Sequence, residues 1–351
     1  MYIAPRPLMG EDPLFPVRIA LMPPIGLLLA MVIGSPLAMI YPIMMFSLIA
    51  GNRKAFNPGR VFAAPIVFGA ALWLMSGVVV VLQGMPTVLV MVMGLLYFLA
   101  FYVIQRTGMA AGMLIIVAGA LMSIMGLGSY PAMAYLRAEM TKAAICSAFV
   151  IPILYALLPP KTVEKHVDDA APAFDYGWST RAAIRAVVML GYSLYLYTIL
   201  DFSNMMLAVA GMYVLVHSTR QSIWREAGQR SFSVLLGGTM ALGILAIMTV
   251  AGHLTVLVAL IFLATLWVGH KMLTGRLPPM AYQDAGSVMI SLVGSALATS
   301  EPTFAFVQRA GLTVLGTLLA ALLVSILDAM LVKEPQTLGD ALADRNALEN
   351  L

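Results

Sequence analysis

The sequence predicts an all-α membrane protein that crosses the bilayer many times. Three features indicate this class: 61% of the 351 residues are hydrophobic, only 10% are charged, and the mean hydropathy is +0.94. A typical soluble domain has about 25% charged residues. The composition excludes a soluble enzyme, a disordered scaffold and a nucleic-acid-binding protein, although the net charge is +4. The single cysteine, Cys146, excludes an internal disulfide.

The apolar runs predict about twelve transmembrane helices, because a helix needs about 20 largely apolar residues to cross the hydrocarbon layer. The first six runs cover 17–34, 36–51, 61–83, 86–105, 108–128 and 138–158. The other six cover 183–200, 204–219, 232–250, 254–269, 280–298 and 308–332. Several neighbours are separated by very short joints, which predicts antiparallel hairpins because lipid cannot satisfy an irregular backbone.

Charge, glycine and proline justify these breaks in chain order. The separating segments are Ser35-Pro36, the basic loop 52–60, Gly84-Met85, Ser129-Tyr130-Pro131, the polar linker 159–181, Asp201 to Asn204, the basic loop 220–230 and Ser300-Glu301-Pro302. Within the runs, Pro23-Pro24 and Pro42 interrupt helical hydrogen bonding. Such breaks are typical either of helices that line a binding site or of simple packing kinks, and both readings stay open.

The basic residues predict that both termini are cytoplasmic. With that orientation, all but three of the 20 Lys and Arg residues fall on the cytoplasmic side. The exceptions are Arg137, Lys142 and Arg309. The reverse orientation would place most of the basic residues outside.

The chain repeats itself at a period of about 170 residues, which predicts two parallel six-helix units. Arg18 opens the first unit and Arg185 the second, and R-x-x-x-T follows a proline in each, at Arg137 and Arg309. The expected domains are a cytoplasmic segment 1–16, a first repeat 17–158, a linker 159–182, a second repeat 183–332 and a cytoplasmic tail 333–351.

Five residues are candidates for an organic-anion path. They are Arg137, Arg309, Arg18, Arg185 and Tyr195. A guanidinium can hold a carboxylate through two parallel hydrogen bonds. The alternatives are snorkelling to headgroups for the outer pair and positive-inside anchoring for the inner pair.

Three acidic residues are candidates for proton coupling or a gate, because ionisable groups at membrane depth are usually functional. These are Asp201, Asp284 and Glu301. Asp201 also fits a helix cap, and Asp284 also fits a first-turn carboxylate that complements the helix dipole. Glu139 and Glu301 are expected to be solvated on the periplasmic side. We expect no metal site and no cofactor, since neither a ligand cluster nor a phosphate-binding loop is present.

An arginine followed by a glycine-rich span occurs twice in the second repeat. Arg230 precedes Gly237-Gly238-Thr239, and Arg309 precedes Gly316-Thr317. In the first repeat Arg60 is followed by Gly69-Ala70 instead of Gly-Thr. With the six-plus-six layout, these motifs make the chain resemble the fusaric acid resistance-like and aromatic acid exporter superfamily, over residues 17–332.

The resemblance implies a compact, membrane-only branch, much of it classed as a domain of unknown function, because only a short linker stands where larger members carry a cytoplasmic domain. It implies a bacterial inner-membrane efflux transporter of aromatic or other organic acids. Such transporters use the proton gradient and work with a periplasmic membrane-fusion adaptor. Arg60, Arg230, Gly238, Thr239, Gly316 and Thr317 would be structural motif residues.

Two other functions are consistent with the same layout. One is a passive organic-anion channel, and the other is a non-transporting subunit that anchors an adaptor protein. No Ser-His-Asp or Cys-His arrangement indicates an enzyme. A small-residue face at Gly108–Gly112 is compatible with a homodimer.

Overall fold

The computed structural model describes residues 10–52, 54–107, 111–164, 177–199, 211–217, 219–298 and 302–332. In these ranges the regular structure is helical and no strand is found. The labelled helices are α1 (Phe15–Ile33), α2 (Ile40–Ala50), α3 (Pro58–Leu82), α4 (Pro86–Thr107), α5 (Ala111–Gly128), α6 (Tyr130–Leu157), α7 (Trp178–Ile199), α9 (Arg220–Val250), α10 (Leu254–Thr274), α11 (Pro279–Ala298) and α12 (Pro302–Leu331). Residues 211–215 are helical as well. Eight helices in this described part are long and apolar enough to cross a membrane, so the chain is an all-α, multi-pass membrane protein.

Two helices begin well before the expected apolar runs. α6 begins at Tyr130 rather than near 138, because the Ser129 side chain caps it by accepting a hydrogen bond from the backbone N–H of Ala132 (3.4 Å). α9 begins at Arg220 rather than near 232, because Thr219 and Ser222 form a reciprocal capping box. The expected basic loop 220–230 is therefore wrong: this segment is the first part of α9.

α2 is shorter than the expected span 36–51. It has 11 residues, about half the length needed to cross the hydrocarbon layer. Pro42 lies in its first turn, where no helical N–H bond is lost. A Cβ at Gly26 of α1 would come within 2.9 Å of the Pro42 nitrogen, so the glycine lets α1 and α2 approach closely.

α1 remains helical through Pro23 and Pro24. Pro24 has no N–H, so the carbonyl of Ala20 loses its usual helical donor. The Thr265 hydroxyl of α10 lies 3.3 Å from that carbonyl oxygen, as a second and longer contact beside its hydrogen bond to the Ile261 carbonyl of its own helix (2.7 Å). The proline pair therefore marks the contact between α1 and α10.

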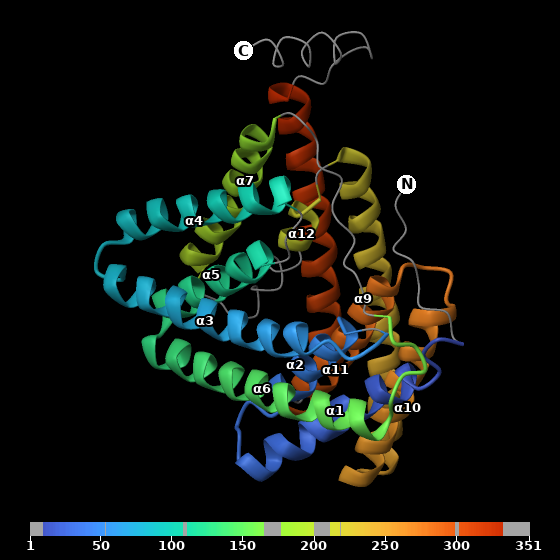
Figure 1. Ribbon diagram of the computed structural model, residues 1–351. Helices are drawn as coiled ribbons and strands as arrows, with labels where there is room; N and C mark the ends of the chain where they lie inside the picture. The colour runs from blue at the N-terminus through green and yellow to red at the C-terminus, as the bar shows by residue number, and fades with distance from the viewer. Residues whose placement is uncertain are drawn as a thin grey trace, which may run out of the picture.

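The helices form two groups. α1 packs on α10 of the later group, and α7 packs on α4 of the earlier one, so one helix from each part of the sequence crosses to the other group. α3 packs on α5 and α6, and α4 packs on α5 and α7; in the other group α9 packs on α11 and α12, and α10 packs on α1. Figure 1 shows α3, α4 and α5 on one side of the molecule and α9 and α10 on the other, with α12 between them. One buried apolar cluster is centred on α3, α4, α5 and α7, and the second on α1, α2, α10 and α11.

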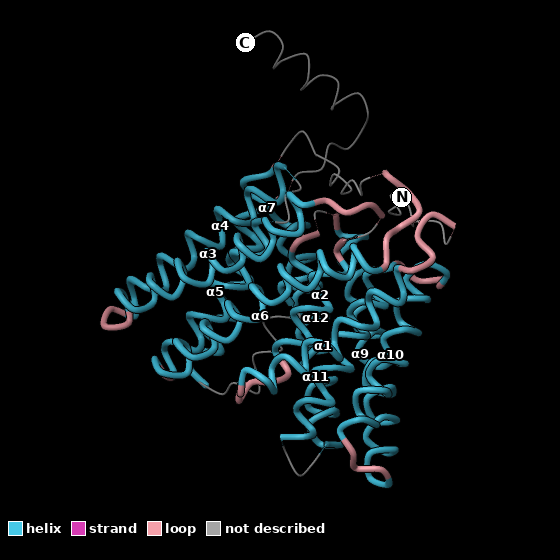
Figure 2. Tube along the Cα trace, turned by 60° about the horizontal axis from the view of Figure 1, so that its bottom comes forward, coloured by secondary structure: helices cyan, strands magenta, loops and turns pink. Residues whose placement is uncertain are grey.

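Loops from distant parts of the sequence gather at one end of the molecule. The Lys54 ammonium is 3.0 Å from the Glu164 carboxylate and 3.7 Å from that of Glu11. The backbone N–H of Lys161 donates to the carbonyl of Glu11 (3.2 Å). Figure 2 shows these loops together, far from the α3–α4 and α9–α10 hairpins. The segments before α1, after α2 and after α6 thus share one face, as expected for connections on the same side of a membrane.

The glycines of the Gly237-Gly238-Thr239 motif allow close helix contacts. A Cβ at Gly237 would overlap the backbone carbonyl of Ala285 on α11. One at Gly238 would overlap the Phe306 ring on α12. Small residues at such positions let helix backbones pack directly against each other in a membrane.

We predict that Gly237→Ala destabilises the protein by about 1–3 kcal/mol, because a backbone carbonyl cannot move aside for the added methyl group. Gly243→Ala on the same helix is the matched control, since nothing lies within 4 Å of a Cβ there. Unfolding in mixed detergent micelles measures both. Equal stability of the two variants would contradict the close contact.

Candidate functional site

A cluster of ionisable side chains lies between α9 and α11, and we call it the α9–α11 charge cluster: His217, Glu226, Arg230 and Asp284. Arg230 is at its centre, with Nε 2.9 Å from Glu226 Oε1 and Nη1 3.1 Å from Asp284 Oδ2. His217 Nε2 lies 3.5 Å from Glu226 Oε2. The ring of Tyr213 lies 3.8 Å from the Arg230 guanidinium carbon.

The two helices position this cluster through simple spacing. Glu226 and Arg230 are four residues apart on α9 and therefore share one face. Asp284 lies about one and a half turns into α11. The Ser233 hydroxyl donates to the Ala281 carbonyl (2.8 Å), and with the close approach at Gly237 it holds α11 against α9.

The cluster is mostly buried and has an excess of negative groups. The side chains of Arg230, Glu226 and Asp284 are only 10%, 13% and 20% exposed. One guanidinium faces two carboxylates, so the cluster has one uncompensated negative charge while His217 is neutral. One proton, on His217 or on a carboxylate, balances the charges. This arrangement can therefore bind and release a proton within an apolar bundle.

Arg18 and Arg185 occupy corresponding positions at the starts of α1 and α7, and both are fully buried. Arg18 pairs with Asp12 and donates to the Leu158 carbonyl (2.7 Å). Burial raises the pKa of the Asp12 carboxyl, although the Arg18 guanidinium opposes this shift. Arg185 pairs with Asp328 (3.3 Å) and donates to the His217 carbonyl (2.9 Å). These contacts join the start of α1 to the residue that follows α6, and the start of α7 to the last turns of α12.

Arg137 has no acidic partner among the described residues. Its guanidinium carbon lies 3.8 Å from the ring centre of Trp73, and Nη1 donates to the Ser76 hydroxyl (2.6 Å). Its Nε is buried without a hydrogen-bond partner. Trp73 and Ser76 are both on α3, so the Arg137 side chain extends from α6 to the neighbouring helix α3.

Glu139 is buried, which contradicts the expectation that it is solvated. It accepts hydrogen bonds from the Tyr41 hydroxyl (3.1 Å) and from Ser35, and it pairs with Lys142 (2.8 Å). The α1–α2 turn supplies Ser35 and α2 supplies Tyr41, whereas Lys142 lies on α6 itself. Lys142 is therefore the counter-ion of a buried carboxylate.

The tyrosines of α7 are divided between the interior and the surface. Tyr195 is 51% exposed on the outside of α7. Tyr192 donates to the Gly316 carbonyl of α12 (2.9 Å), and Tyr197 donates to the Ser123 hydroxyl of α5 (2.7 Å). The buried polar contacts of α7 thus come from the neighbours of Tyr195.

The remaining motif residues are distributed along the helices. Arg60 lies in the first turn of α3 and is half-buried. Thr239 is exposed and bonds only within α9, whereas Thr317 is buried and bonds to the Thr313 carbonyl within α12. Asp201 and Glu301 lie outside the described residues, as does the side chain of Arg309, which is in α12.

Sequence reasoning identified Arg230 and Asp284 separately but missed their partner Glu226. The spacing of four residues between Glu226 and Arg230 was the available signal. It also missed Asp12, which precedes the first apolar run, and Asp328, which lies near the end of the run 308–332. Among the described residues no group of His, Cys, Asp and Glu side chains is arranged to hold a metal ion.

Comparisons of the chain with protein-family models, curated proteins and solved structures find no match. Its function is therefore inferred from the geometry of these sites.

We predict that Arg230→Gln destabilises the protein by about 3–5 kcal/mol, because it leaves two buried carboxylates without their shared counter-ion. Adding Asp284→Asn should recover part of that loss. The measurement is the free energy of unfolding in mixed micelles. Arg225→Gln is the control, because Arg225 is exposed on the same helix. If Arg230→Gln were as stable as the control, the cluster would not be buried as described.

Proposed function

We propose that this protein is a proton-gradient-driven exporter of small organic, aromatic anions in the bacterial inner membrane. Its partners would be the bilayer, a periplasmic membrane-fusion adaptor and the anion itself. The observation that carries the proposal is the α9–α11 charge cluster, in which two buried carboxylates share one guanidinium. Its uncompensated negative charge provides a proton-binding site inside the apolar bundle.

The helix packing supports a duplicated architecture of two parallel six-helix repeats. α3 contacts α5 and α6 in the first half, and α9 contacts α11 and α12 in the second. α1 packs on α10, and α7 packs on α4, so the first helix of each half crosses to the fourth helix of the other. Arg18 and Arg185 occur at equivalent places in this exchange. The segments before α1, after α2 and after α6 lie at one end, which is the arrangement expected if all three lie in the cytoplasm.

Fewer residues are available for an anion path than the sequence indicates. Arg18 and Arg185 are already paired with carboxylates, which leaves little of their charge for a solute. Arg137 has no acidic partner in the described part of the chain and is held by an aromatic ring and a hydroxyl group. We assign Asp284 and Glu226 to proton coupling and keep Arg137 as a candidate contact for an anionic group at the membrane surface.

The test is uptake of radiolabelled aromatic acids into inverted membrane vesicles whose lumen is made acidic. We expect accumulation in the acidic lumen. Passive permeation of a neutral weak acid works in the opposite direction, so it cannot produce this result. Flux that follows membrane potential and ignores the pH gradient would indicate a passive channel. No accumulation under either gradient would indicate a non-transporting subunit.

We predict that Asp284→Asn lowers pH-driven uptake at least about tenfold while leaving the protein folded, because Arg230 keeps Glu226 as its counter-ion. Arg225→Gln should transport like the unmodified protein. Uptake rates, normalised to the amount of protein in each vesicle preparation, give the comparison. Unchanged pH dependence in Asp284→Asn would remove Asp284 from the coupling site.

A further inference from the structure

A shallow groove runs along the outer face of the α3–α6 pair. Its lining includes Ile66, Gly69 and Trp73 of α3, with Thr141 and Ile145 of α6. Ile66, Trp73 and Ile145 are each more than half exposed, so the groove opens to the side of the molecule that faces lipid. Its volume is about 270 Å³. Compact ligands occupy sites of about 300–1,000 Å³, so the groove fits part of an extended molecule.

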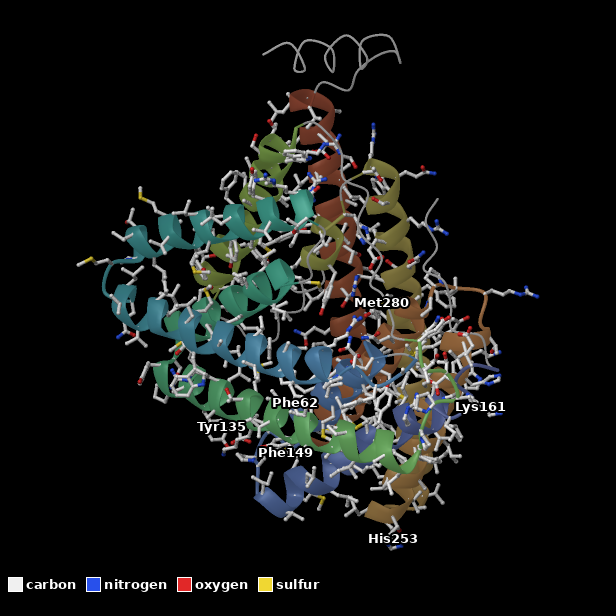
Figure 3. The ribbon with its side chains drawn as sticks, viewed as in Figure 1. Phe62, Tyr135, Phe149, Lys161, His253 and Met280 are labelled. Carbon is white, nitrogen blue, oxygen red and sulfur yellow. The ribbon has the colours of Figure 1, made fainter. Side chains whose placement is uncertain are left out.

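The groove is apolar along its length and cationic at one end. Arg137 lies one turn before Thr141, beside Trp73, and no acidic residue in the described part of the chain pairs with it. At the other end Phe62 lies one turn before Ile66, and Phe149 one turn after Ile145. Figure 3 shows Phe62 and Phe149 on these two helices. The distance from Arg137 to Phe149 along α6 is about 18 Å, from twelve residues at about 1.5 Å each.

The guanidinium lies close to the level of the lipid headgroups, because α6 has 28 residues and, at about 42 Å, is longer than the hydrocarbon layer of about 30 Å. Arg137 is about 10 Å inside the start of α6, and Ser76 is about 9 Å inside the end of α3. Ser76 and Trp73 hold the guanidinium at this depth. A cation held at headgroup level, at one end of an apolar groove, is suited to a lipid phosphate whose acyl chain enters that groove.

We propose that this groove binds one anionic phospholipid, with its phosphate at Arg137 and one acyl chain along Trp73, Gly69 and Ile145. Gly69 keeps the groove open, since nothing lies within 4 Å of a Cβ built there. The proposal does not depend on transport activity. A phosphate pairs well with a guanidinium, and the π face of Trp73 on the other side of the cation keeps it in place.

The experiment uses Trp73 as the reporter. The purified chain is placed in phosphatidylcholine vesicles that contain either phosphatidylglycerol or additional phosphatidylcholine, brominated on one acyl chain at the same bromine content. Bromine quenches nearby indole fluorescence, and subtraction of a Trp73→Phe variant isolates the contribution of Trp73. We expect Trp73 to be quenched at about fivefold lower brominated lipid when the lipid is anionic.

Three variants test the geometry. Arg137→Gln should abolish the preference for phosphatidylglycerol, whereas Arg137→Lys should keep part of it because the charge remains. Gly69→Leu should reduce quenching by both lipids because it fills the groove. Gly77→Leu is the matched control, since Gly77 is exposed on the same helix and has the same free space.

Three results would overturn the proposal. Equal quenching by the two lipids in the unmodified protein would show that the groove does not select anions. Loss of the preference on addition of millimolar benzoate, without any lipid exchange, would assign the site to a small soluble acid. A preference that survives Arg137→Gln would also remove Arg137 from the site.

Discussion

The structure depends on the neutralisation of buried guanidinium groups. A charge inside an apolar bundle is costly unless a partner compensates it, and this chain buries arginines at the points where helices from different parts of the sequence meet. Arg18 joins the start of α1 to the end of α6, and Arg185 joins the start of α7 to the end of α12. Arg230 joins α9 to α11. The ion pairs of Arg185 and Arg230 and the hydrogen bond from Arg18 to the Leu158 carbonyl each connect segments far apart in sequence, so these arginines help to specify which helix ends lie together.

Arg137 is not neutralised in this way, because its partners are an aromatic ring and a hydroxyl group. Neither carries a negative charge, so its positive charge is held in place without being cancelled. Glu139, two residues away on the opposite side of α6, is fully satisfied by Ser35, Tyr41 and Lys142. One turn of helix thus carries both a neutralised carboxylate, which fixes the α1–α2 turn, and an available cation, which faces the bilayer. This contrast separates residues that hold the fold together from those that can meet an anion.

The apolar runs were sufficient to predict most helices, because long hydrophobic segments in lipid can only be helical. They could not predict where α6 and α9 begin, since Ser129 and Thr219 start these helices within polar sequence. Composition also could not show that α2 is too short to cross, because Pro36 to Met39 are as apolar as the helix itself. At the site, Arg230 and Asp284 were identifiable as rare charges at membrane depth, but their contact depends on the close approach at Gly237. Pairing of this kind is a property of the packed helices and has no local sequence signal.

The crossing of α1 to α10 has a consequence for synthesis. α1 leaves the ribosome first, yet the Thr265 hydroxyl that serves its proline-freed carbonyl, and much of the surface that buries it, belong to a helix made more than 200 residues later. Before α10 is synthesised, the Ala20 carbonyl lacks the Thr265 contact, and α1 can pack only on its earlier neighbours α2 and α6. The two halves are therefore not separate folding units, and translation of the second half completes the assembly of the first.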